Sequence, residues 1–280
     1  MLICSKINEL ERFLSERRSK GDKIGFVPTM GALHQGHLSL ISNSKTSCNL
    51  TVCSIFVNPN QFNDKDDLQK YPRTPSEDIN LLKSADCDVV FMPTVEEIYP
   101  HQEITHFDFG YLDKVLEGQH RPGHFNGVAQ VVKRLFEIVK PNKAFFGGKD
   151  FQQVMIVKAL VKKLALDVEI VPCAILREKD GLAMSSRNTL LSIQERQLAV
   201  NIPIWLQDAK KIIKTSQLTE AKKFISHEIS KHPSMRLDYF EVCELDSLEI
   251  LNDDTEFNSR IALIALFVGK IRLIDNINID

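Results

Sequence analysis

The sequence lacks any long apolar run and any block of like charge. Its longest apolar stretch, residues 261–268, is far too short to cross a bilayer, which takes about 20 apolar residues in a helix. The 35 basic and 37 acidic side chains nearly cancel, and the formal net charge is -2. This balance argues against a nucleic-acid-binding or membrane-binding surface, and we expect neither partner. Any bound anion must therefore be held locally by a few placed groups.

Clustered cysteines are also missing. The six cysteines stand at positions 4, 48, 53, 87, 173 and 243, and no two of them form a C-x-x-C pair. Zinc sites need tighter clustering, and disulfide frameworks are typical of small secreted domains. Charged residues interrupt the N-terminal segment at once, which does not fit a secretory signal peptide. The sequence predicts reduced structural thiols and a cytoplasmic protein.

What is present is an ordinary globular composition, with 43% apolar and 26% charged residues over 280 positions. The first part alternates β-rich runs with helical patterns, and strands that alternate with helices are typical of a parallel sheet covered on both faces. Strands are predicted at 23–27, 49–57, 88–92, 143–146 and 167–175, with helices through 38–41, from 75, and at 126–139 and 151–164. We therefore predict an α/β, Rossmann-like domain over residues 1–175.

From residue 176 the pattern changes. A polar loop (177–188) leads to predicted helices at 193–214 and 219–231, and strand-like runs follow at 236–242, 261–268 and 271–274. Helices followed by strands indicate a smaller α+β domain over residues 176–280, which we expect to cover the active site. In parallel sheets ligands bind beyond the carboxyl ends of the strands, so the loops there are the candidate site.

One helix start carries a specific signal. Thr74, Pro75 and Glu77 form the pattern of an N-cap, a proline at the first helical position and a glutamate three residues after the cap. This pattern predicts a capping box in which the threonine and glutamate side chains bind backbone N–H groups.

The segment after the first predicted strand, residues 28–37, contains His34 and His37 at a predicted helix start. Residues three apart share one face of a helix, and the N-terminus carries unpaired N–H groups and positive partial charge that favour phosphate. Gly31 and Gly36 allow close backbone approach. Solvent-facing histidines and a metal site are the alternatives, and the latter lacks a third clustered ligand.

Residues 34–37 (HQGH) resemble the H-x-G-H signature of the nucleotidyltransferase superfamily, which includes the class I aminoacyl-tRNA synthetases. Residues 184–187 (MSSR) stand where that superfamily has its second, K-M-S-K-S-type signature, and an ordinary polar turn is the alternative. Finer motifs in chain order resemble the pantothenate synthetase family over nearly the whole sequence. They are residues 28–31 (PTMG), 54–59 (SIFVNP), 61–62 (QF), 71–74 (YPRT), 121–125 (RPGHF), 145–147 (FFG), 149–150 (KD), 180–188 (DGLAMSSRN) and 272–276 (RLIDN).

This resemblance implies an AMP-forming ligase that adenylates pantoate with ATP and then lets β-alanine displace AMP. It implies catalytic roles for His37 as proton donor, and for His34, Lys149 and Arg187 around the phosphates. Because two anions must approach each other, positioning and charge neutralisation are the main needs, and no covalent protein nucleophile is required. The ATP contacts that it implies are Met30, Gly31, His34, Gly36, His37, Gly147, Lys149, Asp150, Leu176, Met184, Ser185, Ser186 and Arg187.

For pantoate and β-alanine the resemblance implies Gln61 and Gln153, whose amides donate and accept without adding charge. Glu117, Arg121 and His124 are weaker candidates, with surface salt bridges as the alternative. Mg²⁺ is expected to be held mainly by the phosphates, and its protein ligands stay unassigned. A homodimer is implied as well.

One position departs from the family. Where it usually reads G-E-K-D, this chain has Gly148 in place of glutamate. The nearest alternative function is another small-molecule adenylyltransferase that keeps AMP on its product. An aminoacyl-tRNA synthetase is disfavoured by the small size and the neutral charge. A nucleotide sensor without turnover is disfavoured because His34, His37, Lys149 and Arg187 are all present.

Overall fold

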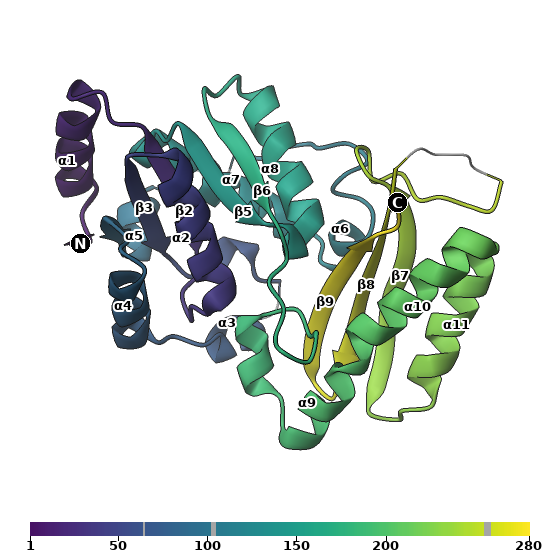
Figure 1. Cartoon of the computed structure of the whole chain (residues 1–280). Helices are drawn as coiled ribbons and strands as arrows, with labels where there is room; N and C mark the ends of the chain where they lie inside the picture. The colour runs from purple at the N-terminus through teal and green to yellow at the C-terminus, as the bar shows by residue number, and fades with distance from the viewer. Residues whose placement is uncertain (64, 102–104, 255–258) are drawn as a thin grey trace. The chain divides into compact units, whose positions relative to one another are not determined.

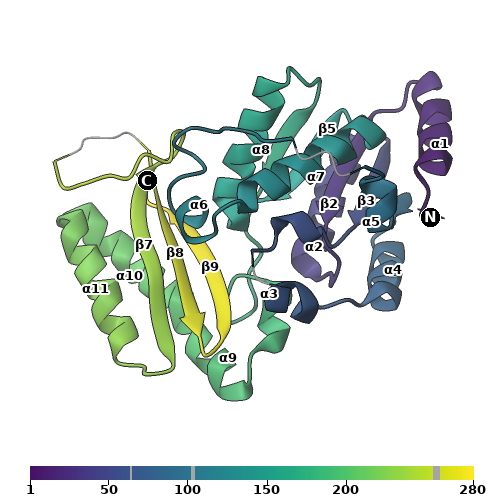
Figure 2. The same ribbon diagram turned by 180° about the vertical axis from the view of Figure 1, so that it is seen from behind.

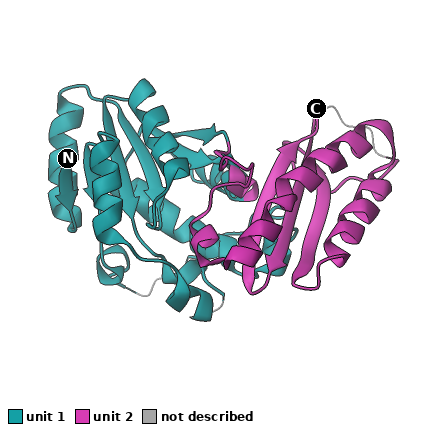
Figure 3. Ribbon diagram, turned by 60° about the horizontal axis from the view of Figure 1, so that its bottom comes forward, with its two compact units in different colours: residues 1–148, 153–174 teal, residues 149–152, 175–280 magenta. Residues whose placement is uncertain are grey.

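A computed structural model describes residues 1–63, 65–101, 105–254 and 259–280. These residues form two compact units, which Figure 3 colours separately. Unit 1 comprises residues 1–148 and 153–174, and unit 2 comprises residues 149–152 and 175–280. Lys149 and Asp150 therefore belong to the same unit as the segment 184–187.

Unit 1 is built on a parallel sheet, which among the described residues has six strands in the order β1-β4-β3-β2-β5-β6 (Figure 1). Helices flank this sheet, and the predicted Rossmann-like fold is confirmed. The strands are β1 (Leu2–Cys4), β2 (Ile24–Thr29), β3 (Leu50–Ile55), β4 (Val89–Phe91), β5 (Lys143–Gly147) and β6 (Glu169–Cys173).

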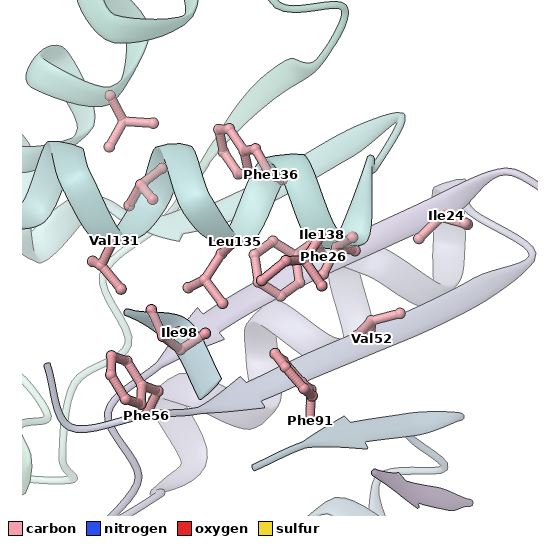
Figure 4. Packing of buried hydrophobic residues seen from close by; sticks show 14 of the residues in the cluster. Ile24, Phe26, Val52, Phe56, Phe91, Ile98, Val131, Leu135, Phe136 and Ile138 are labelled. Atoms are coloured by element: carbon pink, nitrogen blue, oxygen red, sulfur yellow. The ribbon is translucent and has the colours of Figure 1, made fainter. Parts of the chain in front are cut away.

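The two faces of the sheet follow from the alternation of side chains along each strand. Ile24 and Phe26 of β2 pack into one apolar cluster, whereas Val27 of the same strand packs into another. The first cluster includes Phe136, whose ring meets Phe26 edge to face at 6.2 Å (Figure 4). It draws buried side chains from α1 (Ile7–Ser19), α7 (His124–Val139) and α8 (Phe151–Lys163), and the second from α2 (Gln35–Ser47) and α4 (Pro75–Ser84).

Shorter helices complete the unit: α3 (Lys65–Lys70), α5 (Val95–Ile98), α6 (Glu117–His120) and the 3₁₀ turn η1 (Pro59–Gln61). The 3₁₀ turn η2 (Gly148–Asp150) follows β5, and its Lys149 and Asp150 belong to unit 2. The predicted capping box at Thr74 is wrong. Thr74 is the N-cap of α4, but its side chain makes no capping hydrogen bond. Its hydroxyl donates instead to Asp78 Oδ1 at 3.1 Å.

The strand order places the candidate loops at one position of the sheet. From β2 the chain moves to β3 on one side, whereas from β5 it moves to β6 on the other side, and β2 and β5 are neighbours. Such a reversal is the place where open parallel sheets bind ligands, beyond the carboxyl ends of the two strands. Residues 30–34, which lead to the two histidines and are called the histidine loop below, follow β2. Gly147 ends β5.

Unit 2 contains an antiparallel sheet, with three strands among the described residues in the order β7-β8-β9. Helices α10 and α11 run along one face of it, in front of the sheet in Figure 1 and behind it in Figure 2. Trp205 and Leu206 of α10 and Ile225 of α11 are buried against apolar side chains of the strands. The elements are α9 (Ile193–Ala199), α10 (Asn201–Thr215), α11 (Leu218–Ser230), β7 (Met235–Glu244), β8 (Arg260–Val268), β9 (Ile271–Asn278) and the turn η3 (Ser186–Leu190).

The helix predicted over 193–214 is two helices that meet at Val200. Pro203 explains the break, because proline has no N–H to donate to the carbonyl four residues earlier, at Ala199. No helix in the described parts of the chain combines the length and apolarity that crossing a bilayer requires.

Candidate active site

The loop between β2 and α2 is held by one buried carboxylate. Gly31 and Ala32 both have positive φ, +81° and +49°, so the chain turns sharply here. The N–H of Ala32 donates to Asp78 Oδ2 at 3.0 Å, and the N–H of Leu33 donates to Asp78 Oδ1 at 2.7 Å. Asp78 is only 1% exposed, and with the Thr74 hydroxyl it accepts three hydrogen bonds that compensate its burial. Asp78 therefore fixes the loop that leads to the histidines.

The two histidines close the first turn of α2. His34 is the N-cap, and its Nδ1 accepts from the N–H of Gly36 at 3.1 Å. The N–H of His34 donates to Nδ1 of His37 at 3.3 Å, and the two ring centroids are 4.1 Å apart. Since each Nδ1 accepts a hydrogen bond, each ring is neutral and carries its proton on Nε2.

This arrangement presents hydrogen-bond donors for an anion. Two Nε2–H groups stand at the N-terminus of a helix whose aligned peptide dipoles place positive partial charge there. The site can bind phosphate without a fixed positive charge, and its hydrogen bonds strengthen as negative charge grows on the oxygens they contact.

Gln61 lies in a polar network beside this loop. It is 8% exposed; its Nε2 contacts Met30 Sδ at 2.9 Å and its Oε1 accepts from Asn58 Nδ2 at 3.2 Å. Asn58 Nδ2 also donates to the Gly127 carbonyl at 3.0 Å, and its Oδ1 accepts from the Tyr99 hydroxyl at 3.0 Å. Burial raises the pKa of Tyr99 to about 12, so the phenol keeps the proton that it donates. The structure therefore brings Met30 and Gln61 together and fixes the orientation of the Gln61 amide.

A second network holds the backbone of Gln61. His124 Nδ1 is 2.8 Å from the Gln61 carbonyl, and its Nε2 is 3.2 Å from Arg121 Nη1. Arginine can only donate, so Nε2 accepts and Nδ1–H donates, the tautomer opposite to that of the helix-cap histidines. Glu117 lies 3.7 Å from Arg121. Glu117, Arg121 and His124 thus form a buried or half-buried chain that ends on Gln61, rather than surface salt bridges.

Helix α7 contacts the turn η1 most closely at Gly127. A Cβ on Gly127 would stand 2.1 Å from the carbonyl oxygen of Asn60, which no side chain could tolerate. The absence of a side chain at Gly127 therefore lets α7 pack directly against the turn that carries Gln61.

Lys149 and Asp150 follow β5 in the 3₁₀ turn η2. Lys149 Nζ lies 3.4 Å from the Asp150 carboxylate, and the Asp150 side chain is about half exposed. The Lys149 side chain is half-buried, but its partner is open to solvent, so the pair is weak and the ammonium can exchange the carboxylate for a phosphate at low cost. Gly147 leaves open space where a Cβ would stand.

The segment 184–187 is an ordered turn in unit 2. The N–H of Met184 donates to the Leu176 carbonyl at 3.0 Å, and the N–H of Arg187 donates to Ser185 Oγ at 3.2 Å. Ser185 is the N-cap of η3, and Ser186 is 8% exposed. Hydroxyls, backbone amides and the guanidinium of Arg187 occur together here, a set suited to pyrophosphate.

Comparison with known proteins decides the family. The family model for pantoate-beta-alanine ligase matches residues 2–278. The chain is 46% identical to the pantothenate synthetase of Bacteroides fragilis over 277 residues, which cover 99% of this chain and 98% of that protein. The chain belongs to the pantoate-beta-alanine ligase family.

Solved structures agree with this assignment. Pantothenate synthetase from Thermus thermophilus superposes with a TM-score of 0.93 at 37% identity, covering 100% of this chain and 99% of that one. Pantoate-beta-alanine ligase from Francisella tularensis, solved in complex with beta-gamma ATP and β-alanine, gives 0.80 at 36% identity, with 100% and 98% covered. The family resemblance drawn from the sequence motifs is confirmed.

Within this pantoate-beta-alanine ligase fold, three residues shape the site through contacts that the sequence does not predict. Asp78 orders the histidine loop, and Asn58 and Tyr99 order Gln61. Asn58 lies in the motif at 54–59, but neither its spacing nor that of Tyr99 indicates the contact. Asp78 looks in sequence like an ordinary acid in the first turn of a helix. Gln153 is half-buried at the start of α8.

Proposed function

We propose that this chain joins (R)-pantoate to β-alanine with consumption of ATP, giving pantothenate, AMP and pyrophosphate through a pantoyl-adenylate intermediate. The observation that carries the proposal is the match to the pantoate-beta-alanine ligase family over residues 2–278. The histidine pair, neutral and seated on a helix N-terminus, supplies donors of the kind that a phosphate-transfer step requires.

In the first step a carboxylate oxygen of pantoate attacks the α-phosphorus of ATP, and the bond to the bridging oxygen of the β-phosphate breaks. Negative charge grows on the phosphate oxygens and on the leaving pyrophosphate. We assign His34 and His37 to hydrogen bonds from Nε2, with His37 as the main donor. Lys149 and Arg187 neutralise the polyphosphate, and Ser185 and Ser186 add neutral donors.

In the second step the amine of β-alanine attacks the carbonyl carbon of the adenylate. The bond between that carbon and the oxygen of AMP breaks, an amide forms, and the nitrogen loses a proton. We assign Gln61 and Gln153 to pantoate, with Gln61 also near β-alanine. An amide suits both substrates because it donates and accepts hydrogen bonds without adding charge.

Adenosine needs shape and neutral hydrogen bonds. We assign Gly147 and Asp150 to the ribose and the backbone at Leu176 and Met184 to adenine, whereas the backbone of the turn from Met30 approaches the phosphates.

Mg²⁺ enters as part of the substrate MgATP. Within residues 1–63, 65–101, 105–254 and 259–280, no three His, Cys, Asp or Glu side chains form a group that could hold a metal ion. The Asp78 oxygens accept hydrogen bonds from backbone N–H groups of the histidine loop. The phosphates and water are therefore the ligands that we propose for Mg²⁺, in line with its preference for retaining water.

We also propose that the chain acts as a homodimer. Sedimentation equilibrium measures the mass directly, and a mass equal to the 31.9 kDa of one chain at micromolar concentration rejects this part of the proposal.

The reaction is tested by incubating the protein with ATP, Mg²⁺, pantoate and β-alanine and following AMP and pantothenate by mass spectrometry. We expect the two products in equal amounts, with sustained AMP release only when β-alanine is present. An adenylyltransferase that keeps AMP on its product would give a stable adenylate and no dependence on β-alanine.

A further inference from the structure

The last strand of unit 2 reaches the backbone of the proposed phosphate-binding lysine. The side-chain amide of Asn276, on β9, donates from Nδ2 to the main-chain carbonyl of Lys149 at 3.0 Å. Asn276 is 6% exposed, and Lys149 and β9 belong to the same unit. The motif 272–276, which the proposed function leaves without a role, thus contains a residue that binds the turn carrying Lys149.

Asn276 is itself held by an ion pair whose carboxylate is buried. The neighbouring Asp275 is 3% exposed, and its two oxygens accept from Arg177 Nη1 at 2.7 Å and Nη2 at 3.0 Å. Asp275 Oδ1 also accepts from the N–H of Asn276 at 2.8 Å, and Arg177 Nη2 donates to the Asn276 carbonyl at 3.3 Å. A bidentate pair of this kind fixes direction as well as distance, and both groups bind the Asn276 backbone, so the strand position from which the Asn276 amide reaches Lys149 is held in place.

Arg177 also anchors the segment that leads to residues 184–187, which are called the serine–arginine turn below. Arg177 Nη1 donates to the Gly181 carbonyl at 3.1 Å, and Arg177 forms an antiparallel bridge with Ala183. Asn188 Nδ2 donates to the Ala183 carbonyl at 3.1 Å, which closes the turn that contains residues 184–187. One guanidinium therefore connects β9 to the segment that we assign to pyrophosphate.

We propose that Arg177, Asp275 and Asn276 are positioning residues that set Lys149 and the segment 184–187 in fixed relation for pantoate adenylation. This inference rests on the proposed function. Asn276 acts through the Lys149 carbonyl, which limits how the 3₁₀ turn and its ammonium are placed. Arg177 and Asp275 act through Asn276 and through the loop 177–183. None of the three needs to touch substrate, and a shift of about 1 Å in a catalytic group lowers rates by about a hundredfold.

The test replaces Asn276 by aspartate, which keeps the shape of the side chain but sets a carboxylate oxygen against the Lys149 carbonyl. We expect the single-turnover rate of pantoyl-adenylate formation to fall by about tenfold to a hundredfold. The kcat/KM for β-alanine, which enters only after adenylation, should change by less than about twofold. If N276D does not melt cooperatively, Asn276→Ala removes the donor without adding charge, and the same fall is expected.

The matched control is Asn278→Asp, two residues further along β9, where the side chain is exposed and accepts from the N–H of Asp280. The control should keep the wild-type rate, and equal rates for the Asn276 and Asn278 variants would overturn the inference. A wild-type protein that makes no AMP from pantoate, ATP and β-alanine would instead overturn the proposed function.

A double-mutant cycle separates positioning from general destabilisation. If Asn276 acts through Lys149, Asn276→Asp should lower the residual rate of a Lys149→Ala protein by no more than about twofold, because the group it positions is gone. A full tenfold to hundredfold fall in the Lys149→Ala background would show that Asn276 acts elsewhere and would overturn the inference.

Discussion

The two loops proposed to bind phosphate are held in different ways. In unit 1 the histidine loop is fixed by contacts of shorter sequence separation, since His34 and His37 are 3 residues apart and Leu33 and Asp78 are 45 apart. In unit 2 Lys149 is bound by Asn276, 127 residues later, and the loop before residues 184–187 is tied to Asp275 across 98 residues. The first loop is organised by a helix start, whereas the second set depends on a completed sheet.

The histidine loop and the phosphate-binding residues of unit 2 therefore depend on different parts of the fold. The histidine geometry forms with the first turn of α2 and one buried carboxylate. The turn that carries Lys149 and the loop before residues 184–187 are instead bound by Asn276 and Asp275 of β9, a strand that pairs with β8. Changes at the histidines should therefore act directly at the altered residue, whereas changes on β9 should act through catalytic groups that lie about 90 to 130 residues earlier in the sequence.

The largest effect is expected for the histidine pair. His37→Ala should lower the rate of pantoyl-adenylate formation by about 10² to 10³, because a donor to the developing charge is lost. It should cost only about 1 kcal/mol of folding free energy, the value of one helix cap. His37→Asn can keep an acceptor near the Nδ1 position but has no Nε2–H, so it should regain stability without regaining rate. Unchanged single-turnover rates in both variants would remove His37 from its role.

The next largest effect is expected for Asp78→Asn. The amide cannot accept from two backbone N–H groups with both of its ends, so one of Ala32 and Leu33 loses its partner inside the protein. We expect a loss of about 1–3 kcal/mol in the free energy of unfolding, and a fall of about tenfold in adenylation rate as the loop loosens.

The matched control for Asp78 is Glu77→Gln, which alters an exposed carboxylate in the same first turn of α4. Urea denaturation should place this control within about 0.5 kcal/mol of wild type. If the two substitutions have equal effects on stability, Asp78 does not anchor the loop.

A smaller effect is expected at His124, and it depends on which nitrogen is replaced. An asparagine amide can take the place of Nδ1–H and still donate to the Gln61 carbonyl, whereas a glutamine amide reaches the place of Nε2. His124→Gln should raise the KM for pantoate by about tenfold, the value of one buried hydrogen bond, and His124→Asn by less than about threefold. Steady-state kinetics should show little change in the KM for ATP in either case. The reverse order would show that the contact with Arg121 matters more.

The smallest expected effect is a loss of stability at alkaline pH, caused by one buried thiol in each unit. Burial raises the pKa of Cys87 in unit 1 and of Cys243 in unit 2 to about 12, from an ordinary value of 9.0. Since the folded thiols keep their protons while unfolded thiols lose them, the contribution of these two thiols to stability is constant below about pH 9 and falls between pH 9 and 12. Each thiol contributes up to about 1.4 kcal/mol per pH unit within that window.

Denaturation with urea at pH 8, 9 and 10 measures this slope. Cys243→Ala and Cys87→Ala should each reduce the loss above pH 9 by a similar amount. A slope that neither substitution changes would mean that other groups cause the alkaline loss of stability.

Much of the fold was predictable because its signals are local. Buried strands such as β2 and β3 are apolar runs bounded by turn residues, and α7 shows a helical apolar period that ends before Pro141. The strand β1 is too short to carry a pattern. At Thr74 the capping signal is not realised, because the hydroxyl is turned to donate to the buried Asp78 carboxylate and does not accept from a backbone N–H of the helix.

The candidate site was predictable only as far as its motifs reach. His34 and His37 stand out by spacing, and residues 184–187 by their family signature. The contacts that orient these groups were not predictable, because Asn276, Asp275 and Asn58 meet their partners only through sheet pairing or helix packing. The spacing of residues along the chain does not indicate such long-range contacts.

The most direct test of the central claim follows the oxygen that pantoate contributes to the reaction. With pantoate labelled with ¹⁸O in its carboxylate, attack on the α-phosphorus followed by amide formation leaves one labelled oxygen in AMP. We predict AMP that carries a single ¹⁸O and pyrophosphate that carries none, measured by mass spectrometry after complete turnover. Unlabelled AMP, or label in the pyrophosphate, would contradict a pantoyl-adenylate intermediate.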